Sequence, residues 1–352
     1  MDLMPYFKLM VEKKASDLFI TVGSPIKIKI EGKAAPVGKT VLDSNLSKAA
    51  AYGVMNEYQI THFEETMECD FAIAMPDGSA RFRVNVFRQR GEVGMVCRRI
   101  PNQIPTVEEL GLPLILEELI NARRGLILMV GATGSGKSTT LAAMIDHRNE
   151  TMSGHILTIE DPVEFSHPNK KSIINQREVG VDTLSYRNAL KASLREAPDV
   201  ILIGEIRDRE TMEAALELSN TGHLAVSTLH ANNANQAMER VINMFPQDLH
   251  KQLFMDLSLN LRSVISQRLV TGVDGKRCAA IEIMVNTPHI AELILKGELD
   301  GIKEAMEGSG QKGMQTFDLA LYNLYKEGRI ELEEALNNAD SRANLEAKIN
   351  FG

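Results

Sequence analysis

Tryptophan is absent from this sequence, and aromatic residues make up only 5% of its 352 residues. Proteins that bind single-stranded nucleic acid usually stack bases on aromatic side chains, so this scarcity argues against such a protein. The net charge of −8 argues the same way, because a nucleic-acid-binding surface is normally basic. We therefore expect no nucleic-acid partner.

Cysteines and long apolar runs are also scarce. Cys69, Cys97 and Cys278 lie far apart and form no C-x-x-C pair, which favours reduced thiols in a cytosolic protein over a disulfide framework or a zinc site. Lys8 and Glu12 interrupt the first residues before a signal-peptide core could form. No run of ~18 apolar residues occurs, so we expect no insertion into a membrane, while contact with a membrane protein stays open.

The first hundred residues have the pattern of a small α+β domain. Apolar and polar residues alternate over 16–33, 69–87 and 94–100, which predicts strands, and the turn Pro76-Asp77-Gly78 predicts a hairpin. Helical spacing occurs over 3–14 and 42–66. We expect an N-terminal domain over 1–100 with an antiparallel sheet.

Three prolines within 101–113 indicate a linker, and the pattern changes after it. Four apolar runs, GLILMV, HILTI, DVILIG and HLAVST, alternate with helical stretches, which predicts βα units and a mainly parallel sheet over 114–352. Beyond about residue 240 we expect mostly helix, including 249–269, and one strand pair, RLVTG and RCAAIEIMV, around a turn at Val273-Asp274-Gly275.

Residues 131–138 read GATGSGKS, a complete G-x-x-x-x-G-K-[ST] phosphate-binding loop between an apolar strand and a helix. Glycines let backbone N–H groups surround phosphate oxygens, Lys137 supplies charge to the β- and γ-phosphates, and Ser138 offers a hydroxyl to Mg²⁺. We therefore expect ATP and Mg²⁺ as cofactors. The predicted nucleotide-binding residues are Gly131, Ala132, Thr133, Gly134, Ser135, Gly136, Lys137, Ser138 and Thr139.

Two acidic groups follow predicted strands. HILTIEDPVEF places Glu160 after one strand, and DVILIGEIRD places Glu205 after another. A carboxylate at the C-terminal edge of a parallel strand points to the crevice where ligands bind, so one acid can help hold Mg²⁺ through water and the other can orient the attacking water. The residues alone leave open which acid does which, and a solvated loop carboxylate remains the alternative for each.

Together, GATGSGKSTT, TIEDPVEF, ASLREAPDVILIGEIRD and TGHLAVSTLHANNA resemble the secretion and type IV pilus ATPase superfamily in order and spacing. The similarity extends over essentially the whole chain and favours the retraction branch, the PilT/PilU family. Assembly ATPases of the superfamily often carry extra N-terminal domains and four zinc cysteines, which this sequence lacks. Residues 289–306 depart from the PilT form and resemble the PilU form, which implies an accessory motor working alongside a PilT-like ATPase.

The resemblance also implies a fold, partners and roles. It implies a PAS-like N-terminal domain and a RecA-like P-loop domain, with nucleotide between them, in a homo-hexamer. The hexamer would act in the cytoplasm, peripheral to the inner membrane, on the platform protein of the pilus machine. The implied catalytic residues are Glu160 for the attacking water, Glu205 for Mg²⁺ through water, His230 and His223 as the two "His box" histidines, and Arg83 and Arg98 at the γ-phosphate.

Arg83 and Arg98 have a plainer alternative, a solvated strand face, and a zinc site at His223 and His230 is not expected because no further ligands accompany them. The alternatives for the whole protein are an assembly or secretion ATPase, a RecA-like nucleic-acid motor, and a nucleotide-binding partner of PilT that scarcely hydrolyses ATP.

Overall fold

The computed structural model describes residues 1–30, 32–100 and 103–351. The chain divides into two compact units. The first comprises Met1–Gln103, Val163–Ser166 and Gly180–Asp182, and the second comprises Ile104–Pro162, His167–Val179 and Thr183–Gly352. Of the linker expected over 101–113, residues 101 and 102 lie outside the described residues, and the part from Ile104 onward groups with the second unit.

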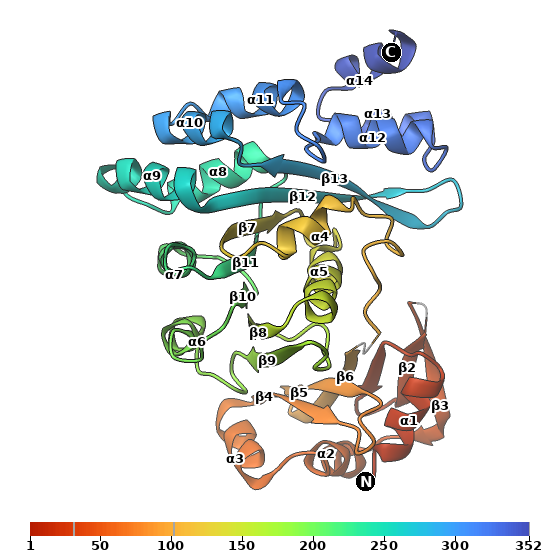
Figure 1. Cartoon of the computed structure of the whole chain (residues 1–352). Coiled ribbons are helices and arrows are strands. Elements are labelled where there is room, and N and C mark those ends of the chain that lie inside the picture. Colours follow the sequence, from red (N-terminus) through yellow and green to blue (C-terminus); the bar gives the residue numbers. More distant parts are fainter. Residues whose placement is uncertain (31, 101–102, 352) are drawn as a thin grey trace. The chain divides into compact units, whose positions relative to one another are not determined.

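The first unit contains a six-stranded antiparallel sheet in the order β3-β2-β1-β6-β5-β4 (Figure 1). Its strands are β1 (Asp17–Ile20), β2 (Pro25–Ile30), β3 (Lys33–Val41), β4 (Glu68–Ala74), β5 (Arg81–Gln89) and β6 (Glu92–Ile100). Its helices are α1 (Met4–Glu12), α2 (Ser44–Tyr52) and α3 (Glu57–Thr66). The single helical stretch expected over 42–66 is thus two helices, because Asn56 starts α3 with a capping box.

Alternation along β5 fixes which face of this sheet is covered. Phe82, Val84 and Val86 are fully buried, whereas Arg81, Arg83 and Asn85, which alternate with them, are partly exposed. The buried face packs against α1, α2 and α3, and the ring of Phe7 from α1 stacks on Phe82 with centroids 4.6 Å apart. The polar face therefore carries the arginines that the sequence singles out.

The second unit contains a seven-stranded sheet in the order β13-β12-β7-β11-β10-β8-β9. Its strands are β7 (Gly125–Val130), β8 (Gly154–Glu160), β9 (Ser172–Glu178), β10 (Val200–Ile203), β11 (Leu224–Leu229), β12 (Leu261–Thr271) and β13 (Arg277–Val285). Neighbouring strands are parallel except β12 and β13, which form an antiparallel hairpin. Each parallel pair is joined by a crossover that contains a helix or a long loop.

The helices of this unit are α4 (Ile115–Ile120), α5 (Lys137–Thr151), α6 (Tyr186–Ser193), α7 (Arg209–Asn220), α8 (Ala234–Asn243), α9 (His250–Asn260), α10 (Pro288–Lys296), α11 (Ile302–Gly308), α12 (Phe317–Lys326), α13 (Leu332–Asn338) and α14 (Arg342–Phe351). In the described residues, every helix is too short or too polar to cross a bilayer.

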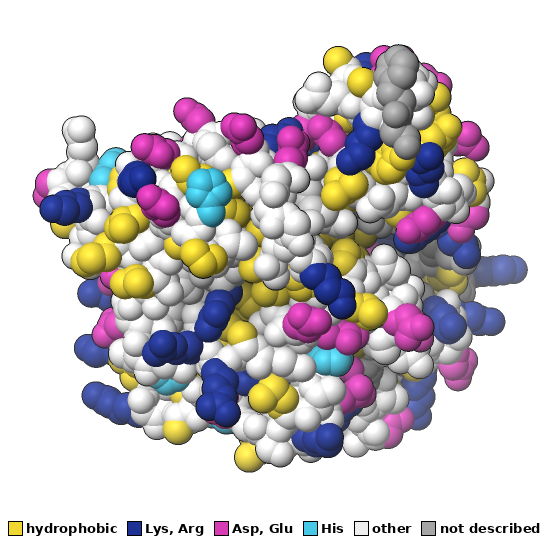
Figure 2. Space-filling view, turned by 45° about the horizontal axis from the view of Figure 1, so that its top comes forward, with side chains coloured by type: hydrophobic (Ala, Val, Ile, Leu, Met, Phe, Trp, Pro, Cys, Tyr) yellow, Lys and Arg dark blue, Asp and Glu magenta, His cyan; other side chains and the backbone are white. Residues whose placement is uncertain are grey.

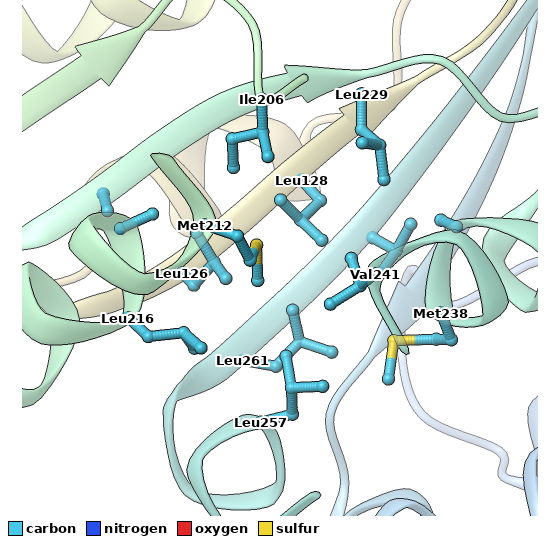
Figure 3. Close-up of a cluster of buried hydrophobic side chains, with 14 of the residues drawn as sticks. Leu126, Leu128, Ile206, Met212, Leu216, Leu229, Met238, Val241, Leu257 and Leu261 are labelled. Atoms are coloured by element: carbon cyan, nitrogen blue, oxygen red, sulfur yellow. The ribbon is translucent and has the colours of Figure 1, made fainter. Parts of the chain in front are cut away.

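Strand β7 is buried on both faces and separates two cores. Leu126 and Leu128 belong to the cluster formed with α6 to α10, part of which is drawn in Figure 3 beside Met212 and Leu261. The intervening Ile127 belongs to a second cluster, formed with α4 and α5. A parallel strand covered on both sides reads as a continuous apolar run, which is why GLILMV carries no polar residue.

The sequence prediction was wrong for the second half of 249–269. Helix α9 ends at Asn260, and Leu261–Thr271 is strand β12 between β7 and β13. The run LRSVISQRL satisfies either periodicity over a short window, and pairing with two neighbouring strands decides in favour of the strand. Strand β9 was not expected, because SIINQRE is more polar than the apolar runs from which the other parallel strands were predicted. It lies at the edge of the sheet, where polar residues are common.

The fold-class prediction is confirmed: an α+β unit with an antiparallel sheet precedes an α/β unit whose sheet is mainly parallel. The carboxyl edge of that parallel sheet, where β7, β8, β10 and β11 end, positions the candidate site.

Candidate functional site

The phosphate-binding loop connects β7 to α5, as predicted. A Cβ atom on Gly131 would lie 2.5 Å from the carbonyl oxygen of Gln267 and 2.6 Å from Oγ of Ser135, so only glycine fits there. Gly136, at the start of α5, has φ +89° and packs against the Gln267 side chain. The Gln267 amide oxygen in turn accepts a 2.7 Å hydrogen bond from the Thr140 hydroxyl. Strand β12 therefore supports the loop from behind.

Lys137 folds over this loop. Its Nζ atom donates to the carbonyl oxygens of Gly131 at 2.7 Å and Ala132 at 2.9 Å. Burial lowers the pKa of the Lys137 ammonium, and the nearby Glu205 carboxylate opposes that shift. The side chain lies at the N-terminus of α5, where backbone N–H groups favour an anion.

Glu205 lies in a three-residue arrangement at the end of β10. Its Oε1 is 3.0 Å from Nε2 of His230, and its Oε2 is 2.7 Å from the Arg207 guanidinium. The hydrogen bond to Glu205 is the main reason that the pKa of the Arg207 guanidinium is raised above its ordinary value. The Thr228 hydroxyl donates to the Gly204 carbonyl, and the Ile206 N–H donates to the Thr228 carbonyl. The backbone on both sides of Glu205 is thus tied to β11, which leads into His230.

Glu160, the last residue of β8, is 9% exposed. Its Oε1 accepts a hydrogen bond from the Thr158 hydroxyl at 2.7 Å and from Nε2 of Gln176 at 3.3 Å. Tyr186 at the start of α6 lies between the two acidic strands, with its hydroxyl beside Gly204. Burial, followed by the Asp161 charge, raises the pKa of Tyr186, so this hydroxyl stays protonated at neutral pH.

A hollow of about 510 Å³ adjoins the loop. Its lining includes Gly131 and Ala132 from the loop, His230, and Gln236 and Arg240 from α8. A cavity of this size suits a small ligand. The arrangement brings together the loop, the acid Glu205 and the histidine His230 on one edge of one sheet.

The two predicted histidines lie at opposite ends of β11. His230 follows Leu229, which pairs with Val130 immediately before the loop. His223 precedes Leu224, which pairs with Gly125 at the start of β7, and its Nδ1 is 3.1 Å from the Leu218 carbonyl. The structure therefore places His230 beside the phosphate loop and His223 at the far edge of the sheet, where a catalytic role within this unit has no geometric support.

Arg83 and Arg98 lie on the polar face of the first unit and are directly opposite each other on β5 and β6. Arg98 pairs at 2.8 Å with Asp17, a buried carboxylate that also approaches Lys29, and Arg83 is 3.8 Å from Asp70. The two predicted arginines are thus neighbours. Like charges this close cost stability, and the carboxylates of Asp17 and Asp70 offset that cost.

Sequence reasoning missed several residues of the site: Arg207, Thr158, Gln176, Tyr186, Gln267 and Thr140. Arg207 was visible as the second residue after Glu205, whereas Gln176 lies in a stretch for which no strand was expected. Gln267 had no signal, because its stretch was expected to be helical and its partner Thr140 is far away in sequence.

The chemistry of the donors fits a magnesium–nucleotide. The loop contains a cradle that a Cβ would fill, and the buried Ser135 hydroxyl oxygen has no partner in the described residues. The exposed Ser138 hydroxyl and the Glu205 carboxylate supply further oxygen atoms. Mg²⁺ prefers such oxygen ligands and takes one or two from protein, with the rest from phosphates and water. Within the described residues, no group of three or more His, Cys, Asp or Glu side chains could hold a metal on its own.

A phosphate-binding loop between a buried parallel strand and a helix, with an acid on a neighbouring strand, defines a P-loop nucleotide-hydrolysing domain. Comparison with known proteins shows to which family of P-loop proteins the chain belongs. The sequence profile of the type II/IV secretion system protein family matches residues 2–342.

Two of the similar proteins are pilus ATPases from Pseudomonas aeruginosa. The type IV pilus ATPase PilU is 54% identical over 100% of this chain and 92% of its own length, and the type IV pilus retraction ATPase PilT is 43% identical over 96% of this chain and 98% of its own. A crystal structure of the pilus retraction motor PilT with bound ADP has a TM-score of 0.91 at 42% identity, covering 98% of this chain and 99% of that one.

The chain therefore belongs to the type II/IV secretion system protein family, among the PilT/PilU type IV pilus ATPases. The resemblance and the prediction of a P-loop ATPase are confirmed, and the ADP in the PilT structure agrees with the predicted nucleotide site. The individual site residues remain predictions.

Proposed function

We propose that this protein hydrolyses ATP to power type IV pilus retraction, as a PilU-type accessory motor that works alongside a PilT-like ATPase. The observation that carries the proposal is the phosphate loop next to the Glu205–His230 pair, within a chain 54% identical to a PilU. The acid, the histidine and the loop are all present, which favours a hydrolysing motor over a merely nucleotide-binding partner.

Within this function each predicted residue has a role. Residues 131–139 hold the phosphates, with Lys137 on the β- and γ-phosphates. Ser138 and, through water, Glu205 would hold Mg²⁺, which would neutralise charge on the β- and γ-phosphates. Glu160 orients the attacking water. His230 contacts Glu205 and reports the state of the γ-phosphate to the rest of the motor.

Arg83 and Arg98 contact the γ-phosphate in this proposal. A planar guanidinium that stays charged suits the oxygens of a transferring phosphoryl group. Their side-by-side placement on one sheet face supports a shared anionic ligand. His223 has a structural role.

The proposed assembly is a homo-hexamer in the cytoplasm, at the inner membrane, that acts on the platform protein of the pilus machine. ATP binding and hydrolysis would drive this action by changing the angle between the two units. Figure 2 shows side chains of both signs on the face that it draws, and the net charge is −8, so a nucleic-acid track is not proposed.

Phosphate release by wild type and by Lys137→Ala tests the enzymatic part. Wild type should turn over ATP and Lys137→Ala should not, because the loop loses its charge on the phosphates. Equal release by both proteins would show that this site does not hydrolyse ATP. A Ser24→Ala variant, far from the loop in sequence and in the other unit, serves as the control.

Pilus retraction in cells tests the motor. Wild type should restore retraction only where a PilT-like ATPase is present, and Glu205→Ala should not restore it. Retraction by wild type in cells without a PilT-like ATPase would contradict the accessory role while leaving the ATPase intact.

A further inference from the structure

Glu160 does not depend on its own strand alone for its orientation. Gln176 lies on the neighbouring strand β9, directly across from Thr158 in the parallel register of β8 and β9. Thr158 and Glu160 are two residues apart on β8, so their side chains share one face with Gln176. Thr158 and Gln176 both donate to Oε1 of Glu160, at 2.7 Å and 3.3 Å.

Gln176 makes a second contact with the opposite end of its amide. Its Oε1 accepts a 2.8 Å hydrogen bond from the backbone N–H of His167. A carboxylate accepts and an N–H donates, so these two partners fix which way the amide points. The side chain therefore joins the Glu160 carboxylate to the segment that returns from the end of β8 to β9.

We propose that Gln176 is a positioning residue for ATP hydrolysis: it orients the Glu160 carboxylate toward the attacking water and ties that orientation to the backbone at His167. This inference rests on the proposed role of Glu160. Thr158, which is fully buried, fixes the carboxylate from its own strand. Two donors on one carboxylate oxygen restrict the orientation of the Glu160 carboxylate, and a fixed orientation is what water positioning requires.

Two substitutions separate the two ends of the amide. Gln176→Met has similar length and removes both hydrogen bonds. Gln176→Glu keeps an oxygen for the His167 N–H, but it replaces the N–H that faced Glu160 with a second carboxylate. Asn175→Leu is the matched control, because Asn175 lies on the same strand, faces the other way and contacts His155 instead.

The experiment measures kcat and KM for ATP with the full-length protein. Gln176→Met should lower kcat about tenfold with KM nearly unchanged, since one hydrogen bond to a charged group is lost. Gln176→Glu should lower kcat at least as much, because it places a second carboxylate against Glu160 where an N–H donor had been. Asn175→Leu should leave both constants unchanged.

A double-mutant cycle with Glu160→Gln decides whether Gln176 acts through Glu160. Gln176→Met should cause no further loss in the Glu160→Gln background. An equal loss in both backgrounds, or no loss from either Gln176 variant, would overturn the inference. Undiminished turnover in Glu160→Gln alone would instead show that the proposed role of Glu160 is wrong. If Gln176→Met does not fold, the same cycle run with Gln176→Glu gives the same decision.

Discussion

His230 Nε2 lies 3.0 Å from Glu205 Oε1, joining the ends of two adjacent parallel strands. Ile203 of β10 pairs with Ser227 of β11, so the residues that follow these strands emerge at the same edge of the sheet. The phosphate loop leaves the next strand, β7, at that edge. His230 therefore contacts the acid Glu205 and also lines the hollow beside the phosphate loop.

His230→Ala should lower kcat for ATP hydrolysis about 10- to 100-fold, the effect of losing one hydrogen bond to a charged group. ATP affinity should change little, because the loop that holds the phosphates is intact. Phosphate release gives kcat, and fluorescent-nucleotide titration gives affinity. Lost affinity with unchanged turnover of bound ATP would contradict this role.

His223→Ala provides the comparison for His230→Ala. The two residues belong to the same strand and the same sequence motif, but His223 contacts the end of α7 at the far edge of the sheet. Its substitution should leave kcat within about twofold of wild type. An equal loss in both variants would show that the two histidines act in hydrolysis together, as the family resemblance implies.

Arg207→Ala should also lower kcat, by about tenfold, because Oε2 of Glu205 loses its guanidinium partner. Arg207→Lys should restore only part of the loss, since an ammonium lacks the planar fork. Arg209→Ala is the matched control: Arg209 is two residues further on and forms an exposed pair with Glu213. If Arg209→Ala and Arg207→Ala lower turnover equally, the effect does not pass through Glu205.

Much of this site follows from local sequence. The loop, both acids and His230 come directly after buried strands, and parallel strands bring their carboxyl ends to one edge. The register of those strands then decides which neighbours meet, and that register is invisible in the sequence. Gln176 was missed for this reason, because its importance depends on the side chains opposite it.

Strand β12 shows a second reason why the sequence prediction was incomplete. Its residues were expected to continue helix α9, and only pairing with β7 and β13 makes them a strand. Once that strand is placed, Gln267 lies under the phosphate loop and Arg268 faces away from it. The periodicity of the sequence could therefore not predict that β12 packs against the phosphate loop.

Glu282→Gln should make stability less dependent on pH. Burial raises the pKa of Glu282 above its ordinary value of 4.5, with Asp340 adding to the shift and the Ala234 N–H and Ser266 hydroxyl opposing it. The folded protein therefore binds this proton more tightly than the unfolded chain. Its contribution is fully present below pH 4.5 and is lost as pH rises through the folded-state pKa.

A glutamine keeps the oxygen that accepts from Ala234 and Ser266 but cannot ionise. The Tm of Glu282→Gln should exceed that of wild type at high pH, and the difference should shrink as the pH falls toward 4.5. Thermal unfolding measured across pH checks this, with the exposed Glu346→Gln as control. A Tm difference that is the same at every pH would rule out titration of Glu282 as its cause.

Arg268→Lys should destabilise the second unit by about 1–2 kcal/mol, because the guanidinium makes contacts that an ammonium cannot reproduce. It lies 3.9 Å from the ring centroid of Phe317, and it donates to Asp340 at 2.7 Å and to the Asn338 carbonyl at 2.8 Å. These contacts hold α12 and the end of α13 to β12. Urea unfolding should show a lower midpoint with an unchanged slope, while Arg277→Lys, at the exposed end of β13, should unfold as wild type does. Equal midpoints for Arg268→Lys and wild type would mean that the apolar contacts of Phe317 and Leu321 hold these helices without the guanidinium.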